Sequence, residues 1–183
     1  MVKAWRRANL LLAGVSSVIT GLLLAGCTDG SSDARALPKG TTETTVSRTP
    51  DAERAEALDA YRAMWDDLVV AARTSDAEHP QLDDHANEGA LELLRHMMRE
   101  NKKQGVVTKG QPKFAPVVTE GGATKVVIQD CADGSHWLQY TEDGSLNNDV
   151  PGGHHRVDAT VGKHKDRWLV ESLYIDEVGT CLE

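Results

Sequence analysis

The hydrophobic pattern of this chain changes its period once, close to Gly105, and that change limits the fold more than any other feature. Before it, apolar residues recur at the helical spacing of about 3.6 residues. After it, runs rich in Val, Thr, Trp and Tyr are separated by Gly and Asp-Gly turns. Two helical segments followed by antiparallel strands predict an α+β domain with its helices on one face of a sheet.

The helical half contains two segments with an apolar stripe. The first spans residues 51–74 and follows Thr49-Pro50, which is typical of a helix start. The second runs from about residue 87 to 103, with Leu91, Leu94 and Met98 on its buried edge and Gly105 as its stop. The stripe predicted for the first helix consists of Ala57, Tyr61, Met64, Trp65, Leu68, Val69 and Ala72.

The strand half contains five candidate strands. The last of them is apolar on both alternations, which indicates either a central strand or a protein contact. We prefer the central strand, and homodimerisation through the open sheet face is the second interpretation. The predicted strands span residues 106–119, 124–131, 136–142, 154–164 and 167–177.

The N-terminal segment has the three parts of a lipoprotein signal peptide. A basic start precedes an apolar run that ends in Leu24-Ala25-Gly26-Cys27. Two small residues before a cysteine are typical of the site where that cysteine receives lipid before cleavage. A plain transmembrane anchor is the alternative, but the run is barely long enough to span a bilayer and no basic cluster follows it. We therefore predict a signal peptide over 1–26 and lipid on Cys27.

Residues 27–50 then form a predicted tether. Beyond Cys27 they are rich in Ser, Thr, Gly, Asp and Pro and have almost nothing to bury. The folded domain is expected over 51–183, attached through the lipid to the outer face of the cell membrane. Removal of Lys3, Arg6 and Arg7 with the signal changes the formal net charge from −8 to −11. An acidic surface repels phosphate backbones, which argues against nucleic acid as a partner.

The remaining titratable residues predict one structural bond and no metal or cofactor. With Cys27 assigned to lipid, Cys131 and Cys181 form an even pair, which an oxidising exterior favours as a disulfide. The seven histidines include no HxxxH or HExxH motif, and adjacent His154 and His155 would face opposite sides of a strand. No metal site is therefore predicted.

A family resemblance covers about residues 52–181. The segments DCAD (130–133) and VGTC (178–181), with the helical stretch that begins ANEGALELL, resemble a group of small secreted and lipid-anchored actinobacterial proteins. These are similar to the NTF2-like superfamily, in which helices pack on a strongly curved antiparallel sheet that closes into a cone. The resemblance implies that fold. It does not imply an activity, because the superfamily contains enzymes, binding modules and dimerisation domains.

Catalytic candidates are few. Relatives in the wider superfamily use a carboxylate with a histidine or tyrosine inside the cone, and here Asp158, His155, Asp130 and Tyr140 lie on predicted strands. The apolar alternation of Val157 and its neighbours places Asp158 outside instead. We therefore expect a membrane-tethered, non-catalytic binding module outside the cell.

Two other functions stay open. The first is a small isomerase, dehydratase or cyclase that uses Asp158 with a histidine such as His155. The second is a structural partner for another envelope protein.

Overall fold

The structure is a computed structural model that describes residues 49–147 and 152–181. All described residues belong to one compact unit. The predicted signal peptide and Cys27 lie outside the described residues. The elements are α1 (Pro50–Ala72), η1 (Pro80–Asp83), α2 (Glu88–Lys103), β1 (Val106–Gly110), β2 (Val117–Gly121), β3 (Lys125–Asp133), β4 (Trp137–Thr141), β5 (His154–His164) and β6 (Arg167–Val178).

Helix α1 forms where the apolar stripe predicts it. Thr49 is the N-cap, with its hydroxyl oxygen accepting from the Ala52 N–H at 3.3 Å, and Pro50 occupies the first turn, where no backbone donor is needed. The seven residues of the predicted stripe are all buried, which confirms that interpretation. One long face of α1 therefore packs into the core.

The N-cap of α1 supports a first stability prediction. Thr49→Ala removes the acceptor for the Ala52 N–H and is expected to lower the free energy of unfolding by about 0.5–2 kcal/mol. Thr49→Ser retains a hydroxyl at the same position and serves as the control. Urea denaturation of the two variants measures the difference; an equal loss in both would contradict the capping role.

Helix α2 packs a narrower edge into the core. Ala90, Leu94 and Met98 are completely buried, whereas Leu91, which the sequence placed on the same edge, is only partly buried. Gly105 follows the helix with φ +66°, the left-handed conformation that ends helices and that glycine adopts without strain. The predicted stop is confirmed.

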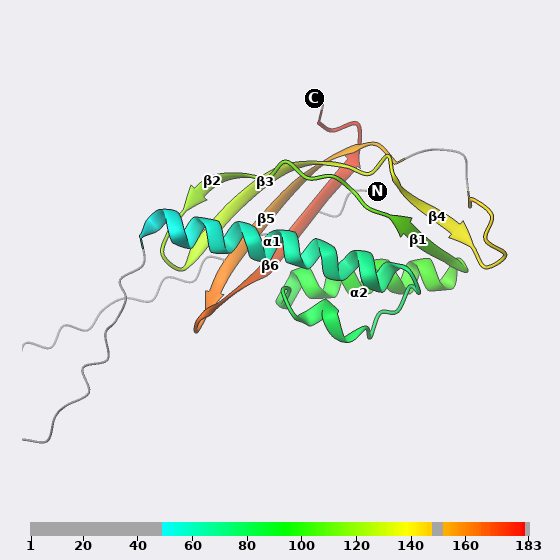
Figure 1. Ribbon diagram of the computed structural model, residues 1–183, viewed down its shortest axis with the longest axis horizontal. Helices are drawn as coiled ribbons and strands as arrows, with labels where there is room; N and C mark the ends of the chain where they lie inside the picture. The colour runs from blue at the N-terminus through cyan, green and yellow to red at the C-terminus, as the bar shows by residue number, and fades with distance from the viewer. Residues whose placement is uncertain (1–48, 148–151, 182–183) are drawn as a thin grey trace, which may run out of the picture. The chain divides into compact units, whose positions relative to one another are not determined.

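The strands form two antiparallel sheets. A four-stranded sheet has the order β2-β3-β5-β6, and β1 pairs with β4 in a separate two-stranded ribbon. In Figure 1, α1 runs across the larger sheet and the ribbon lies near the C-terminal end of α1. Side chains of α1, α2, β3, β5 and β6 share one hydrophobic core. The predicted α+β class, with helices packed on antiparallel strands, is confirmed.

The single strand predicted over 106–119 is wrong. The chain leaves the ribbon at Gly110, makes an isolated bridge to Asp133 of β3 at Lys113, and forms a strand of the larger sheet at β2. Gly110 has φ +92°, and a Cβ there would collide with the carbonyl of His136. Pro112 and Pro116 follow, and neither has an N–H for a sheet hydrogen bond. The apolar residues of this stretch suggested one continuous strand, whereas the chain passes here from one sheet to the other.

A bulge in β6 corrects the interpretation that this strand is buried on both faces. Thr160 pairs with Ser172 but Val161 pairs with Val170, so β6 has one extra residue at Glu171. The extra residue changes which alternate positions face inward. Trp168 and Val170 are buried before the bulge and Leu173 after it, whereas Tyr174 is 61% exposed. The strand has one buried face, and its double apolar alternation no longer argues for a dimer. It also lies at the edge of the larger sheet, beside β5, so the predicted central position is wrong.

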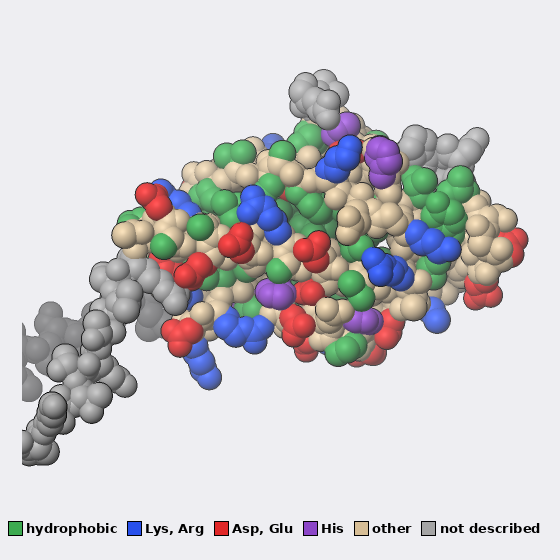
Figure 2. Space-filling model, in the orientation of Figure 1, with side chains coloured by type: hydrophobic (Ala, Val, Ile, Leu, Met, Phe, Trp, Pro, Cys, Tyr) green, Lys and Arg blue, Asp and Glu red, His purple; other side chains and the backbone are tan. Residues whose placement is uncertain are grey.

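The surface is mixed in character. Figure 2 shows apolar side chains interspersed with acidic and basic ones on the visible face. The large exposed apolar residues, which are Val117, Leu146, Tyr174 and Val178, come from β2, from β6 and from the segment after β4. Among the described residues, no helix combines the length and the hydropathy needed to cross a membrane.

Candidate functional site

An apolar cavity of about 160 Å³ lies in the core between the helices and the sheet. We call it the inner chamber. It takes side chains from α1, α2 and β3 to β6, so each layer of the fold contributes to its wall. Its lining residues are Trp65, Met97, Pro112, Ala132, Gly134, Trp137, Gly152, His155, Val157 and Ile175.

The inner chamber exists because small residues lie where larger ones would fill the core. On β3, alternation turns Ile128, Asp130 and Ala132 inward, and Ala132 is the smallest of them. Gly134 and Gly152 pass so close together that a Cβ on Gly152 would collide with the Gly134 carbonyl. Space is therefore left beside Ala132, at the end of the core where β4 begins.

Aromatic rings form one wall of the inner chamber. Trp65 on α1 lies 4.8 Å from the Phe114 ring centroid and 6.3 Å from that of Trp137, in tilted and edge-on arrangements. Such pairs contribute about 0.5–1.5 kcal/mol beyond the area they bury. The two tryptophan rings of the wall meet nearly at a right angle, with an interplanar angle of 84°. The Nε1 atoms of Trp65 and Trp137 are both buried without a hydrogen-bond partner among the described residues.

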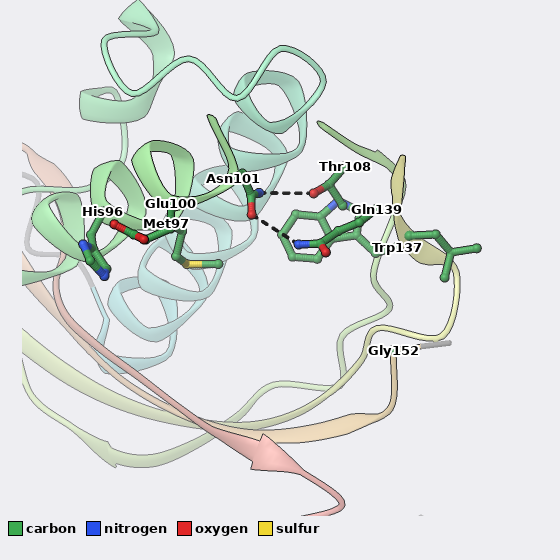
Figure 3. Close-up of a pocket in the computed structure, with 9 residues that line it drawn as sticks. His96, Met97, Glu100, Asn101, Thr108, Trp137, Gln139 and Gly152 are labelled. Atoms are coloured by element: carbon green, nitrogen blue, oxygen red, sulfur yellow. Dashed lines mark hydrogen bonds between the residues drawn. The ribbon is translucent and has the colours of Figure 1, made fainter. Parts of the chain in front are cut away.

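A second, more polar cavity of about 440 Å³ adjoins the first, between α2 and the β1–β4 ribbon. We call it the outer chamber. It shares Met97, Trp137 and Gly152 with the inner chamber. Figure 3 shows the Met97, Asn101 and Trp137 side chains directed into the same space. The other residues that line it are His96, Glu100, Thr108, Leu138 and Gln139.

Two amides and a hydroxyl are linked along the outer chamber. Asn101 Nδ2 donates to Thr108 Oγ1 at 3.4 Å, and Gln139 Nε2 donates to Asn101 Oδ1 at 3.2 Å (Figure 3). Asn147 Nδ2 in turn donates to Gln139 Oε1 at 3.2 Å. Each of the two chamber amides therefore accepts one hydrogen bond and donates one, and sequence periodicity gave no sign of this arrangement.

His155, one of the two sequence-predicted catalytic residues, does line the inner chamber. Its Nδ1 lies 2.8 Å from the carbonyl oxygen of Asp176, which can only accept, so Nδ1 carries the proton. The neutral ring then has its lone pair on Nε2. His155 is the titratable member of the described lining and can act as a hydrogen-bond acceptor or a base.

Asp158, the other predicted catalytic residue, lies on the opposite face of β5 from His155. Its carboxylate accepts from Gln129 Nε2 at 3.0 Å and from Arg156 Nε at 3.0 Å. The hydrogen bond from Gln129, with that from Arg156, lowers the pKa of Asp158. Val157 and Ala159 beside it are buried, as the apolar alternation indicated. The structure therefore does not bring Asp158 and His155 together.

The Asp130 carboxylate is buried and faces the core, but it already accepts two hydrogen bonds within the protein. Tyr61 Oη donates to Asp130 Oδ2 at 3.0 Å, and the Ala115 N–H donates to Asp130 Oδ1 at 2.8 Å. Burial raises the pKa of both groups, and for Tyr61 the Asp130 charge adds to the effect. Neither residue belongs to the described lining of the inner chamber. This pair joins α1 to β3 and braces the core behind the chamber.

The other sequence candidates lie elsewhere. Tyr140 belongs to the ribbon, where Lys109 Nζ lies 4.8 Å from its ring centroid. In the described part of the chain, no three His, Cys, Asp or Glu side chains gather closely enough to hold a metal ion. Cys131 and Cys181 are bonded, with their Cα atoms 5.9 Å apart, as the cysteine count predicted.

Comparison with known proteins identifies the fold. Neither the models of protein families nor the curated proteins match this sequence. Solved structures do. A protein provisionally classified as an aromatic ring hydroxylase from Novosphingobium aromaticivorans matches with a TM-score of 0.50 and 12% identity, over 71% of this chain and 92% of that one.

Two further structures have lower scores. The intermembrane space region of the chloroplast protein ARC6 has a TM-score of 0.48 and 12% identity, over 71% of this chain and 99% of that one. A provisionally classified scytalone dehydratase from Novosphingobium aromaticivorans has 0.44 and 11%, over 72% and 98%. The likeness to the first structure, the provisionally classified aromatic ring hydroxylase, supports the NTF2-like fold that the sequence resemblance implied. Identities this low show the fold alone, and that fold includes enzymes and binding modules.

Proposed function

We propose that this chain is a lipid-anchored, extracytoplasmic, non-catalytic binding module whose ligand occupies the inner chamber. The observation that carries the proposal is the character of that chamber. The side chains of its described lining are apolar apart from His155 and the rings of Trp65 and Trp137, whose Nε1 atoms are buried. Small-molecule sites are typically apolar cavities with a few placed polar groups. A volume of about 160 Å³ is close to the ~150 Å³ engineered cavity that stays dry and binds benzene.

The tether part of the proposal rests on the sequence. The basic start, the apolar run and the small residues before Cys27 are in the order that lipoprotein export requires. Two acyl chains on Cys27 would hold the chain to a membrane, whereas one chain binds only marginally. The resemblance to lipid-anchored actinobacterial proteins, and a second copy or an envelope protein as partner, stay predictions.

Metabolic labelling tests the tether. Cells that express the full chain and are fed an alkyne fatty acid are expected to incorporate it into the wild type and into Cys131→Ser. Cys27→Ser is expected to lose the label. Label retained in Cys27→Ser, or absent from the wild type, would contradict lipid attachment at this cysteine.

An enzyme of the isomerase, dehydratase or cyclase type is the second candidate, and the position of His155 favours it. Its Nε2 lone pair could accept a proton from a substrate in the inner chamber. The geometry supplies no carboxylate partner for His155. Asp158 faces away from the inner chamber, and Asp130 accepts hydrogen bonds from Tyr61 and Ala115 instead. The binding module is therefore the function that we propose.

Filling the inner chamber tests the binding proposal. Ala132→Leu adds three carbons to the wall of the chamber and is expected to reduce benzene affinity at least about tenfold, because the ring and the new side chain compete for one space. Gln129→Leu, on the opposite face of the same strand, is the control and is expected to bind benzene as the wild type does. Calorimetric titration measures both. Equal affinity in both variants would contradict the assignment.

A further inference from the structure

The described lining of the inner chamber contains an accessible side-chain nitrogen, which is Nε2 of His155. The ring of His155 lines the chamber, while its Nδ1 donates to the carbonyl oxygen of Asp176, which is not part of that lining. Nε2 has no hydrogen-bond partner among the described residues. Unlike the Nε1 atoms of Trp65 and Trp137, it is not enclosed by surrounding atoms. The polar side chain that this lining presents to a ligand is therefore an acceptor.

The place of His155 in the sheet directs Nε2 over the chamber. His155 lies on β5 directly opposite Ala132 of β3, and its Nδ1 faces Asp176 of β6 on the other side. An imidazole ring directs its two nitrogens apart, so Nε2 points away from β6 and toward the Ala132 side. That is where the small residues Ala132, Gly134 and Gly152 leave the chamber open.

The surroundings of Nε2 limit what it can accept from. An anionic group would lose its hydration in a chamber whose described lining contains no Lys or Arg. An ammonium group would have three donors for one acceptor. A neutral group with a single donor, such as a hydroxyl, leaves nothing unpaired.

The apolar walls select the body that carries this hydroxyl. Trp65 and Trp137 meet nearly edge to face, and aromatic rings favour tilted and edge-on contacts with one another. The chamber volume of about 160 Å³ is close to that of a cavity that binds benzene, so it admits one ring. A single aromatic ring with one hydroxyl satisfies both the walls and Nε2.

We infer that the inner chamber selects a small phenol, whose ring packs against the two tryptophan rings and whose hydroxyl donates to His155 Nε2. This inference rests on the proposed binding function. It adds the chemical class of the ligand and makes His155 the residue that determines specificity. The Asp176 carbonyl positions the ring, because it keeps the proton on Nδ1 and the lone pair on Nε2.

Phenol and toluene are matched probes, because they differ only by a hydroxyl in place of a methyl group. Calorimetric titration gives the affinity of the purified full chain for each. His155→Phe retains a ring and removes the acceptor, so it is expected to weaken phenol at least about fivefold more than toluene. Comparing the two probes within one variant cancels any change in chamber size. His136→Phe, which replaces an exposed histidine, is the control and is expected to keep the wild-type ratio of the two affinities.

Nitrogen NMR of the wild type, with its histidines labelled, gives a readout that needs no variant. Phenol is expected to move the Nε2 signal of His155 toward that of a hydrogen-bonded nitrogen and to leave the proton on Nδ1. Toluene is expected to leave both nitrogen signals close to their positions in the free protein. This measurement decides the question if His155→Phe fails to fold.

The outcomes separate this inference from the function on which it rests. Toluene binding without phenol binding, or phenol binding that leaves the Nε2 signal unmoved, would overturn the phenol inference and leave the inner chamber as a ligand cavity. An equal loss of both probes in His155→Phe would do the same. Binding of neither probe by the wild type would overturn both proposals together.

Discussion

Replacing Cys131 and Cys181 together by Ser is expected to lower the free energy of unfolding by about 4 kcal/mol. The bridge joins residues separated by 50 positions, and a loop of that length loses much of its freedom in the unfolded chain when it is closed. It also fixes the end of the chain to β3, in the middle of the larger sheet. Urea denaturation of the oxidised wild type and of the double variant measures the difference.

Two comparisons isolate the contribution of the bridge. Reduced wild-type protein is expected to unfold at the same urea concentration as the double variant. Cys27→Ser, which lies outside the described domain, is expected to retain the stability of the wild type. A loss of less than about 1 kcal/mol in the double variant would show that the bridge adds little to the fold.

Removing the carboxyl group of Asp130 is expected to have an effect of similar size. Asp130→Ala leaves the Tyr61 hydroxyl and the Ala115 N–H buried without their acceptor, and each orphaned group costs about 1–3 kcal/mol. We therefore expect the free energy of unfolding to fall by about 2–5 kcal/mol. Asp158→Ala, on the outer face of the neighbouring strand, is the control and is expected to cost at most about 1 kcal/mol.

The isosteric variant Asp130→Asn gives this prediction a pH dependence. Burial raises the pKa of Asp130 in the folded state above its unfolded value of about 4. Between those two values the folded chain binds more protons than the unfolded chain, so stability falls as the pH rises through that window. Asn does not titrate. The stability of the wild type relative to Asp130→Asn should therefore decrease as the pH rises from about 4 toward neutrality. A constant or increasing difference would contradict the raised pKa.

Features encoded locally were predictable from the sequence. The buried stripe of α1 follows from the spacing of residues such as Tyr61 and Leu68, and β5 begins and ends where the Val and Thr alternation does. The Cys131–Cys181 pair follows from an even count once Cys27 is set apart. In each case the information lies within one segment or in a simple count.

Features that depend on how segments meet were not predictable. Tyr61 and Asp130 are 69 residues apart, and no periodicity tells which helix residue will face which strand residue. The extra residue at Glu171 reverses the alternation of β6, so that Trp168 and Val170 are buried before it and Leu173 after it. His155 and Asp158 are close in sequence, yet three positions along a strand place them on opposite faces. Single added residues and long-range contacts therefore determine which side chains face the inner chamber.

A crystal structure of the full chain soaked with iodobenzene tests the central claim most directly, because iodine gives an anomalous signal. We expect an iodine peak in the inner chamber, bounded by Trp65, Ala132 and Val157. Crystals of Ala132→Leu are expected to lack it. Iodine found only at surface positions in the wild type would contradict the assignment of the inner chamber as the ligand site.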